Sequence, residues 1–230
     1  MNGVRQVKDS WNAVYQTGSK YKGESPISFI KTIISALKGH DLLAGKGLYI
    51  GCGNGRNYIP LIEEGLDLTG LDISDVALQQ IADRMPHLKV KLICSPLSEY
   101  QPSHNFDYII AIQVFQHGNY DEVISNFQKV ANLLKLGGLF FFRNRASDTL
   151  ASEKYEVIEE TPYGGFTVEY LTGSKKGLEI HFLSEGEINE LPKIGLIPMI
   201  SPYKVRTPRK LPESGDMVHW EGVWQKKDLG

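Results

Sequence analysis

The stretch LYIGCGNGRN, residues 48–57, decides the fold, because it runs an apolar segment directly into three glycines spaced two residues apart. Glycine allows tight turns and a close approach of the backbone to a ligand, and the amides at the start of a following helix face the same loop. Ile59, Leu61 and Ile62 are the first apolar residues of such a helix. The stretch therefore predicts a strand, a ligand-binding loop and a helix, with a small adenine-containing ligand at the loop.

The glycine spacing separates two kinds of nucleotide-binding loop. A dinucleotide fingerprint needs its third glycine at position 56, where the helix packs closely on the strand. This chain has Arg56 there, and the glycine comes one residue earlier. The spacing of Gly51, Gly53 and Gly55 resembles the Gly-x-Gly-x-Gly loop of class I S-adenosylmethionine-dependent methyltransferases.

The composition points to a small-molecule partner. The chain has 230 residues, a formal net charge of -2 and two cysteines, Cys52 and Cys94. Two cysteines do not make a disulfide framework, and no stretch resembles a signal peptide or a membrane span, so we expect a cytoplasmic protein. The small net charge gives no general attraction to nucleic acid or to an anionic membrane. The sequence leaves the oligomeric state open.

Strands and helices alternate through the middle of the chain. Apolar runs predict strands at residues 47–50, 67–71, 90–93, 108–112 and 139–142, with helices between them. Strands that read as continuous apolar runs are typical of a parallel sheet covered on both faces. We therefore expect an α/β fold with a doubly wound, mostly parallel, Rossmann-like sheet.

The chain is expected to form one domain, 1–230, with four parts. Residues 1–40 form an N-terminal arm without clear periodicity and a helix from Pro26 to Gly39 that Ser25 caps. Residues 41–143 form the cofactor-binding core.

The last two parts follow that core. Residues 144–183 contain two strand-like runs, 166–171 and 178–182, which predict a β-hairpin insertion after the fifth strand, acting as a lid. Residues 184–230 carry a capping-box pattern at Ser184 and Glu187 and end in strands at 196–200 and 219–225.

Four segments, in order, resemble the class I methyltransferase core. They are the glycine loop, Gly70–Ser74 with Asp72 at the end of the second strand, Phe106–Ala111 in the fourth strand, and the turn Leu133–Gly138. The end of the chain resembles the antiparallel last strand of that family, so the resemblance implies a seven-stranded sheet and S-adenosyl-L-methionine as cofactor.

The resemblance also implies the cofactor contacts. Asp72 would accept hydrogen bonds from the ribose hydroxyls, a task that suits a carboxylate, although an ordinary strand-end cap is the alternative interpretation. Tyr49 stands where the family usually has an acid, so main-chain carbonyls and the Gln113 side chain would have to receive the cofactor's ammonium group. The implied set is Gly51, Cys52, Gly53, Gly55, Asn57, Asp72, Ile73, Ser95, Pro96, Leu97 and Gln113.

Aromatic residues of the N-terminal arm are further candidates for cofactor binding. Tyr15 and Tyr21, with Trp11, would fold over the cofactor because aromatic faces attract a sulfonium. The alternative is that these rings only fasten the arm to the core.

Two residues are candidates for the chemistry itself. His117, just after the fourth strand, has an ordinary pKa near neutrality and is placed to act as a base, unless it only packs the loop. Arg143 ends the fifth strand and, with the predicted basic loop that carries Lys204, Arg206, Arg209 and Lys210, favours an anionic acceptor, unless that loop is simply solvated. The other histidines lack metal-ligand spacing, so we expect no metal.

These patterns favour an enzyme that transfers a methyl group from S-adenosylmethionine to a small-molecule acceptor by direct displacement. A non-catalytic sensor or partner subunit that binds the same cofactor is the second hypothesis. A nicotinamide-dependent oxidoreductase is the third, and Arg56 weakens it.

Overall fold

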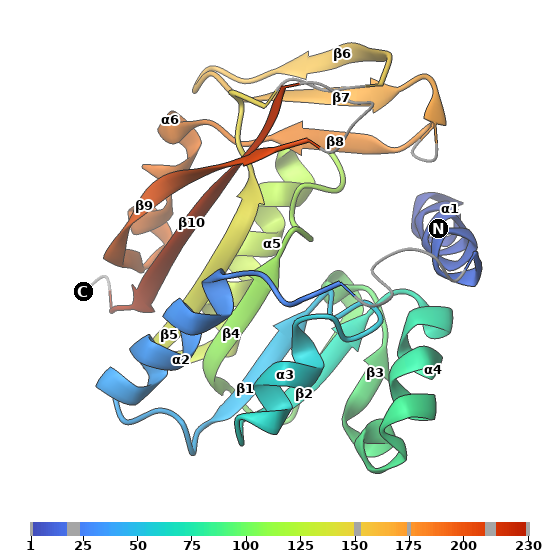
Figure 1. The fold of residues 1–230 in the computed structure, drawn as a ribbon. Helices are drawn as coiled ribbons and strands as arrows, with labels where there is room; N and C mark the ends of the chain where they lie inside the picture. The colour runs from blue at the N-terminus through green and yellow to red at the C-terminus, as the bar shows by residue number, and fades with distance from the viewer. Residues whose placement is uncertain (1, 18–23, 150–152, 174–175, 210–214, 229–230) are drawn as a thin grey trace. The chain divides into compact units, whose positions relative to one another are not determined.

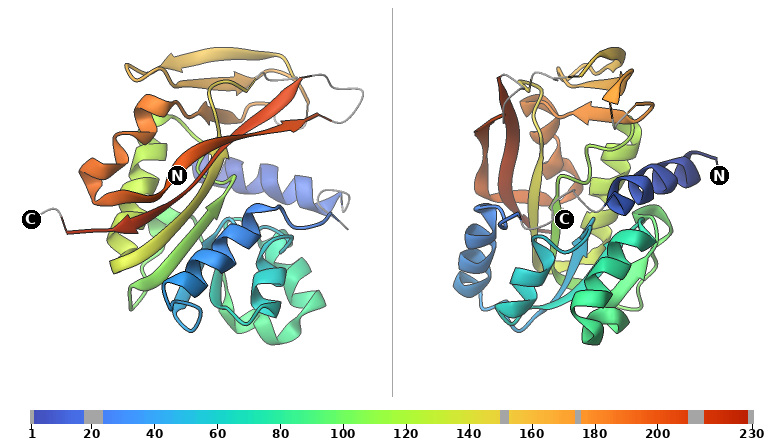
Figure 2. Two further views of the ribbon diagram at one scale, coloured as in Figure 1. Left: turned by 60° about the vertical axis from the view of Figure 1, so that its left-hand side comes forward. Right: turned by 45° about the vertical axis from the view of Figure 1, so that its right-hand side comes forward.

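Seven strands form one mixed sheet in a computed structural model that describes residues 2–17, 24–149, 153–173, 176–209 and 215–228 (Figures 1 and 2). In sheet order the strands are β3 (Leu92–Cys94), β2 (Asp67–Asp72), β1 (Lys46–Ile50), β4 (Phe106–Ile112), β5 (Leu134–Arg145), β10 (Asp216–Lys226) and β9 (Leu196–Pro208). β1 and β2 are parallel, as are β2 and β3, whereas β10 is antiparallel to both of its neighbours. The predicted Rossmann-like sheet with an antiparallel last strand is therefore confirmed.

The chain divides into two compact units, Met1–Ile110 and Ala111–Gly230, and the division falls within β4. The predicted single domain, with internal bounds at residues 40, 143 and 183, stays a prediction. Among the described residues, no helix has the length and apolar character needed to cross a membrane.

The first unit carries four α-helices in its described part. They are α1 (Asn2–Gln16), α2 (Phe29–Gly39), α3 (Tyr58–Glu63) and α4 (Asp75–Arg84). The expected arm without periodicity is wrong, because residues 2–16 form α1. This helix packs against α4, as Figure 1 shows, and Tyr15 is buried.

Two further boundaries in the first unit differ from the prediction. α2 begins at Phe29 rather than Pro26, because the Ile27 N–H donates to the Asn57 side chain and ties the preceding segment to the glycine-loop region instead of to the helix. β3 begins at Leu92 rather than Val90, because Pro86 opens a 3-10 helix that continues to Lys91.

The core of the second unit is aromatic. α5 (Tyr120–Leu133) packs on β5, and the buried rings are those of Phe115, Phe127, Phe140, Phe142 and Trp224, with several centroids 5.0 to 6.3 Å apart. β5 begins at Leu134, so the predicted turn Leu133–Gly138 lies mostly within this strand. These large rings hold the strands that carry the polar residues described below.

The insertion is a three-stranded sheet rather than a hairpin. β7 (Phe166–Tyr170) and β8 (Glu179–Phe182) confirm the predicted pair, and β6 (Tyr155–Glu160) adds an edge strand that the sequence analysis missed. Five of the six residues of β6 are exposed, so the strand lacks the alternating apolar pattern by which strands are recognised. α6 (Glu185–Ile188) follows and has the predicted capping box.

The predicted basic loop is also wrong in its structure. β9 continues to Pro208, and Lys204 and Arg206 lie on it, where their side chains bind Asp148 at 2.7 and 3.4 Å (Figure 2 shows the long β9–β10 pair). Arg209 follows the strand, and Lys210 lies outside the described residues.

Candidate functional site

The glycine loop after β1 has the backbone that its sequence predicts. Gly51, Gly53 and Gly55 have φ values of +68°, +54° and +89°, a region that side chains disfavour. The N–H groups of Gly51 and Cys52 donate to the carbonyl of Leu71, at 2.8 and 3.2 Å, which ties the loop to β2. Burial raises the pKa of the Cys52 thiol, so this cysteine is neutral and packs as a small apolar side chain.

Asp72 ends β2 and turns its carboxylate to this loop. Oδ2 accepts a hydrogen bond from the Gly53 N–H at 2.7 Å, and Oδ1 accepts one from the Ser74 N–H at 2.9 Å. The residue is only 9% exposed, and burial raises the pKa of its carboxyl group against the effect of these hydrogen bonds. An ionised carboxylate has about four acceptor positions, so hydroxyl groups of a ligand can still bind.

The residues after β3 are brought beside Asp72. The Ser95 N–H donates to the main-chain carbonyl of Asp72 at 3.1 Å, and Pro96 and Leu97 start a short 3-10 helix. The carbonyl of Ile73 accepts a hydrogen bond from the Cys94 thiol. The structure therefore brings the segment predicted to bind adenine and the carboxylate predicted to bind ribose together in the first unit, whereas their contacts with a cofactor stay a prediction.

Asn57 and Tyr49 make contacts within the protein. The Asn57 side chain accepts the hydrogen bond from the Ile27 N–H at 3.1 Å. Tyr49 is buried, and burial raises the pKa of its hydroxyl group, so it carries no negative charge at neutral pH. Contact between Asn57 and a cofactor stays a prediction.

α1 reaches the glycine loop. A Cβ atom placed on Gly53 would lie 2.6 Å from the Tyr15 hydroxyl oxygen. The helix is held there because Gln80 donates to the Tyr15 carbonyl at 2.9 Å and Ser74 donates to the Asn12 side chain at 2.7 Å. Tyr15 therefore contacts the loop as a lid residue would, although the lid role stays a prediction, and Tyr21 lies outside the described residues.

The second unit contains the other predicted site residues. Gln113, directly after β4, has a φ of +56°, and its N–H donates to the Arg143 carbonyl at 2.7 Å. Arg143 is buried, and its guanidinium donates to Glu221 at 3.1 Å, so its charge is balanced inside the protein. Direct binding of an anionic acceptor by Arg143 stays a prediction.

His117 lies in the segment between β4 and α5. Its backbone forms an isolated bridge with Ile180, and Gly118, which follows, has a φ of +105°. The residue is half-buried, and its role as a base stays a prediction.

Sequence reasoning missed His219 and Glu221. Both are buried on β10, where Glu221 pairs in register with Arg143 and His219 pairs with Arg145. A signal was present, because these two polar residues, two apart, interrupt the apolar stretch 217–224 and therefore share one face of the strand.

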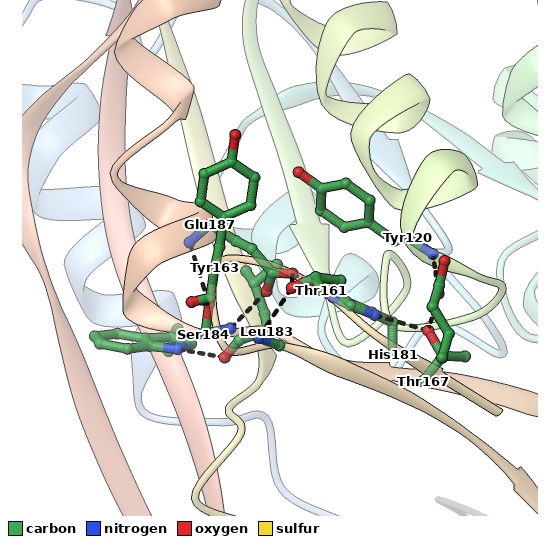
Figure 3. A network of polar contacts seen from close by, with 11 residues as sticks. Tyr120, Thr161, Tyr163, Thr167, His181, Leu183, Ser184 and Glu187 are labelled. Atoms are coloured by element: carbon green, nitrogen blue, oxygen red, sulfur yellow. Dashed lines mark hydrogen bonds and ion pairs between the residues drawn. The ribbon is translucent and has the colours of Figure 1, made fainter. Parts of the chain in front are cut away.

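A second buried polar network joins β7, β8 and α6 (Figure 3). His181 contacts the Thr167 hydroxyl through Nδ1 at 2.9 Å and the Glu187 carboxylate through Nε2 at 3.2 Å. Glu187 also accepts hydrogen bonds from the Thr161 hydroxyl and the Ser184 N–H, at 2.6 and 2.8 Å. The order hydroxyl, imidazole, carboxylate is that of a nucleophilic triad, but His181 and Thr167 have no exposed surface, so no substrate reaches them.

Within the described parts of the chain, no group of three or more His, Cys, Asp or Glu side chains is placed to hold a metal ion.

Comparison with known proteins identifies relatives. Residues 48–140 match a family model described as "Methyltransferase domain". The chain is 30% identical over 94 residues to a ubiquinone biosynthesis O-methyltransferase of Bradyrhizobium sp. (strain ORS 278), a match that covers 40% of this chain and 36% of that protein. The chain thus spans less than half the length of the curated relatives that it matches.

Solved structures share the fold over nearly the whole chain. The 1,6-didemethyltoxoflavin-N1-methyltransferase of Burkholderia thailandensis, solved with S-adenosylhomocysteine, has a TM-score of 0.69 and 18% identity, covering 96% of this chain and 88% of its own. TehB from Haemophilus influenzae has a TM-score of 0.61 and 17% identity, covering 94% and 67%. At these identities the likeness is one of fold.

Proposed function

We propose that this chain, whose residues 48–140 match a family model described as "Methyltransferase domain", is a class I methyltransferase that transfers a methyl group from S-adenosylmethionine to a small-molecule acceptor. The observation that carries the proposal is the Asp72 carboxylate, held at 2.7 Å by the Gly53 N–H. This contact supports the proposal because a carboxylate, which can accept hydrogen bonds from ribose hydroxyl groups, lies against a loop whose backbone lets a ligand approach closely.

The residues of the first unit fit the cofactor chemically. The glycine loop offers backbone, Asp72 offers carboxylate oxygens for two hydroxyl groups, and the segment after β3 offers backbone and the Ser95 hydroxyl for an adenine ring. The Tyr15 ring lies beside the loop with its hydroxyl edge towards Gly53, and an aromatic ring near the ligand suits a sulfonium cation. S-adenosylmethionine supplies an electrophilic methyl group when it is bound.

Displacement of a methyl group from sulfur requires little from the protein beyond geometry. The chain must hold a lone pair of the acceptor in line with the methyl group and exclude water, and such positioning contributes on the order of 7–11 kcal/mol. An acceptor that carries a proton also needs a base, for which His117 is our candidate. A base in this role typically contributes about 10² to 10⁴ in rate.

Two observations support a small molecule as the acceptor. The matched proteins include an O-methyltransferase of ubiquinone biosynthesis and a 1,6-didemethyltoxoflavin-N1-methyltransferase. Ubiquinone and 1,6-didemethyltoxoflavin are both small molecules. The chain also has a net charge of only -2, which gives no general attraction to nucleic acid. The cations that favoured an anionic acceptor, Arg143, Lys204 and Arg206, bind carboxylates of the protein, so the acceptor's charge is not part of the proposal.

Calorimetry tests the proposal directly. We expect S-adenosylmethionine and S-adenosylhomocysteine to bind the purified chain, Asp72→Ala to abolish binding, and the exposed Asp83→Ala on α4 to leave it unchanged. A nicotinamide dinucleotide is the control ligand. Preference for the dinucleotide, or no binding by the unchanged chain, would overturn the proposal.

A transfer assay then separates enzyme from sensor. Labelled methyl groups should move from S-adenosylmethionine to at least one member of a panel of phenols, catechols and nitrogen heterocycles. The neutral Tyr49 in place of an acid is the observation that favours the sensor hypothesis. Binding without transfer to any panel member would support that hypothesis.

A further inference from the structure

A chain of polar side chains crosses the second unit from the end of β4 to β9. Gln113 Nε2 lies 2.9 Å from His219 Nε2, and His219 Nδ1 lies 3.1 Å from an Arg143 Nη atom. Arg143 donates to Glu221 at 3.1 Å, and the Tyr203 hydroxyl donates to the same carboxylate at 2.9 Å. Gln113 is half-buried, Arg143, His219 and Glu221 are buried, and Tyr203 is partly exposed.

The direction of each hydrogen bond in this series of side chains follows from which groups can donate and which can accept. A guanidinium group only donates, so His219 Nδ1 must accept from Arg143 and cannot carry a hydrogen. The neutral ring then carries its hydrogen on Nε2, which therefore donates towards Gln113. Only the carbonyl oxygen of the Gln113 amide can accept this hydrogen bond. The amide is therefore rotated by 180°, so that Oε1 takes the position 2.9 Å from His219 that was given above to Nε2.

The NH2 group of Gln113 consequently lies on the side away from His219. On that side the amide makes no hydrogen bond to any residue within the described ranges. Gln113 also has a φ of +56°, a strained conformation that is concentrated at active sites and ligand-binding positions. It follows β4 directly, at the end of the strand where ligands bind in open α/β sheets.

We propose that Gln113 binds a small molecule by donating its side-chain NH2 to a ligand oxygen, and that His219, Arg143 and Glu221 are positioning residues that fix this polarity. The sequence had suggested the opposite polarity, with Gln113 accepting from an ammonium group. The ligand oxygen belongs to the methyl acceptor, since the residues proposed for the cofactor lie in the first unit and Gln113 lies in the second. This part of the inference rests on the methyl-transfer function proposed above, whereas the polarity of the amide does not.

Nitrogen NMR of the full chain with labelled histidine tests the polarity without any ligand. We expect His219 to be the neutral tautomer with hydrogen on Nε2, and a His219→Asn spectrum identifies its signals. If that variant does not fold, Gln113→Met, which perturbs the same ring, gives the assignment. A hydrogen on Nδ1, or on both ring nitrogens, at neutral pH would overturn the proposed polarity of the Gln113 amide.

Binding measurements identify the ligand oxygen. Gln113→Glu keeps an oxygen for His219 but removes the NH2 group, and the exposed Gln128→Glu on α5 is the control for added charge. A roughly tenfold or greater loss of affinity for S-adenosylhomocysteine in Gln113→Glu, with 5′-methylthioadenosine, which lacks the amino-acid part, unaffected, would overturn the assignment of this oxygen to the methyl acceptor.

If the methyl acceptor is the partner, affinity for S-adenosylhomocysteine stays the same. The KM for 3,4-dihydroxybenzoate, or for the panel compound methylated fastest, then rises roughly tenfold or more at an unchanged cofactor KM. Unchanged values in both assays would overturn the role of Gln113. Failure of the unmodified chain to bind S-adenosylhomocysteine would instead contradict the methyl-transfer function, and the NMR result would still decide the polarity.

Discussion

At the scale of single residues, Gly53 is the position where the cofactor loop and α1 constrain each other. Its φ is +54°, and a Cβ would lie 2.6 Å from the Tyr15 hydroxyl oxygen. Gly53→Ala therefore adds a steric clash to a backbone cost of about 1–2 kcal/mol. We expect the variant to lose more than this backbone cost in free energy of unfolding, measured with urea, and to bind S-adenosylhomocysteine more weakly.

Gly65 supplies a matched control for the backbone cost. Its φ is +91°, and nothing lies within 4 Å of a Cβ built there, so Gly65→Ala should show the conformational cost alone. Adding Tyr15→Phe to Gly53→Ala removes the clashing oxygen and leaves the nearest ring carbon at 3.5 Å. A double variant no more stable than Gly53→Ala would contradict the contact between α1 and the loop.

His219 gives the free energy of unfolding a dependence on pH. Burial, followed by the charges of Arg143, Arg145 and Arg209, lowers the pKa of His219 to about 3, whereas its pKa in the unfolded chain is about 6.5. Between these values only the unfolded state binds the proton. Stability is therefore fully present above pH 6.5 and falls with decreasing pH, by at most about 1.4 kcal/mol per pH unit from this residue.

Urea unfolding at several pH values checks this expectation. The free energy of unfolding of His219→Asn should change less between pH 4 and pH 6.5 than that of the unmodified chain. Parallel curves would show that His219 is not held neutral in the folded state.

At the scale of elements, Glu187 fastens α6 to the three-stranded sheet. Burial alone would raise the pKa of its carboxyl group, but hydrogen bonds from His181, Ser184 and Thr161 outweigh burial and lower this pKa. Glu187→Gln keeps the shape but places an NH2 group among donors. We expect a loss of roughly 1–3 kcal/mol in the free energy of unfolding, the usual cost of leaving a buried donor without its acceptor.

The exposed Glu185, in the first turn of the same helix, is the control. Glu185→Gln should cost no more than about 1 kcal/mol, the usual value of a charge near a helix N-terminus. Equal losses in the two variants would mean that the buried network contributes nothing beyond the charge of the helix end.

Some elements could be predicted from the sequence and others could not, for physical reasons. β1 and β4 are buried and apolar along most of their length, so composition alone indicates them. β6 is exposed on both faces, and the outer half of β9 is polar, so pairing with a neighbouring strand, rather than a hydrophobic pattern, makes these segments strands.

The candidate site divides in the same way. Asp72 and the glycine loop are adjacent to strand ends, and the structure brings them together at 2.7 Å. The contacts of Gln113 depend on His219, which is 106 residues away in sequence, and no local pattern encodes that pairing. The polarity of a side chain in such a network becomes visible only when all of its partners are known.

At the scale of the whole molecule, cofactor binding should appear as stability. A ligand at one hundred times its Kd that binds only the folded chain adds about 2.7 kcal/mol to the free energy of unfolding. We expect S-adenosylhomocysteine to raise the melting temperature with increasing concentration, measured by calorimetry. Asp72→Ala should show no such rise, and an equal rise in that variant would place the binding site elsewhere.

The three tryptophans divide between the two units. Trp11 belongs to α1, beside Tyr15, whereas Trp220 and Trp224 are buried on β10. Each unit therefore carries its own fluorescent reporter. Emission from a variant with both β10 tryptophans replaced by phenylalanine reports on α1 alone, and emission from Trp11→Phe reports on β10. Heating the two variants side by side would reveal whether the first unit and the unit that contains Gln113 lose their structure in one step or in two.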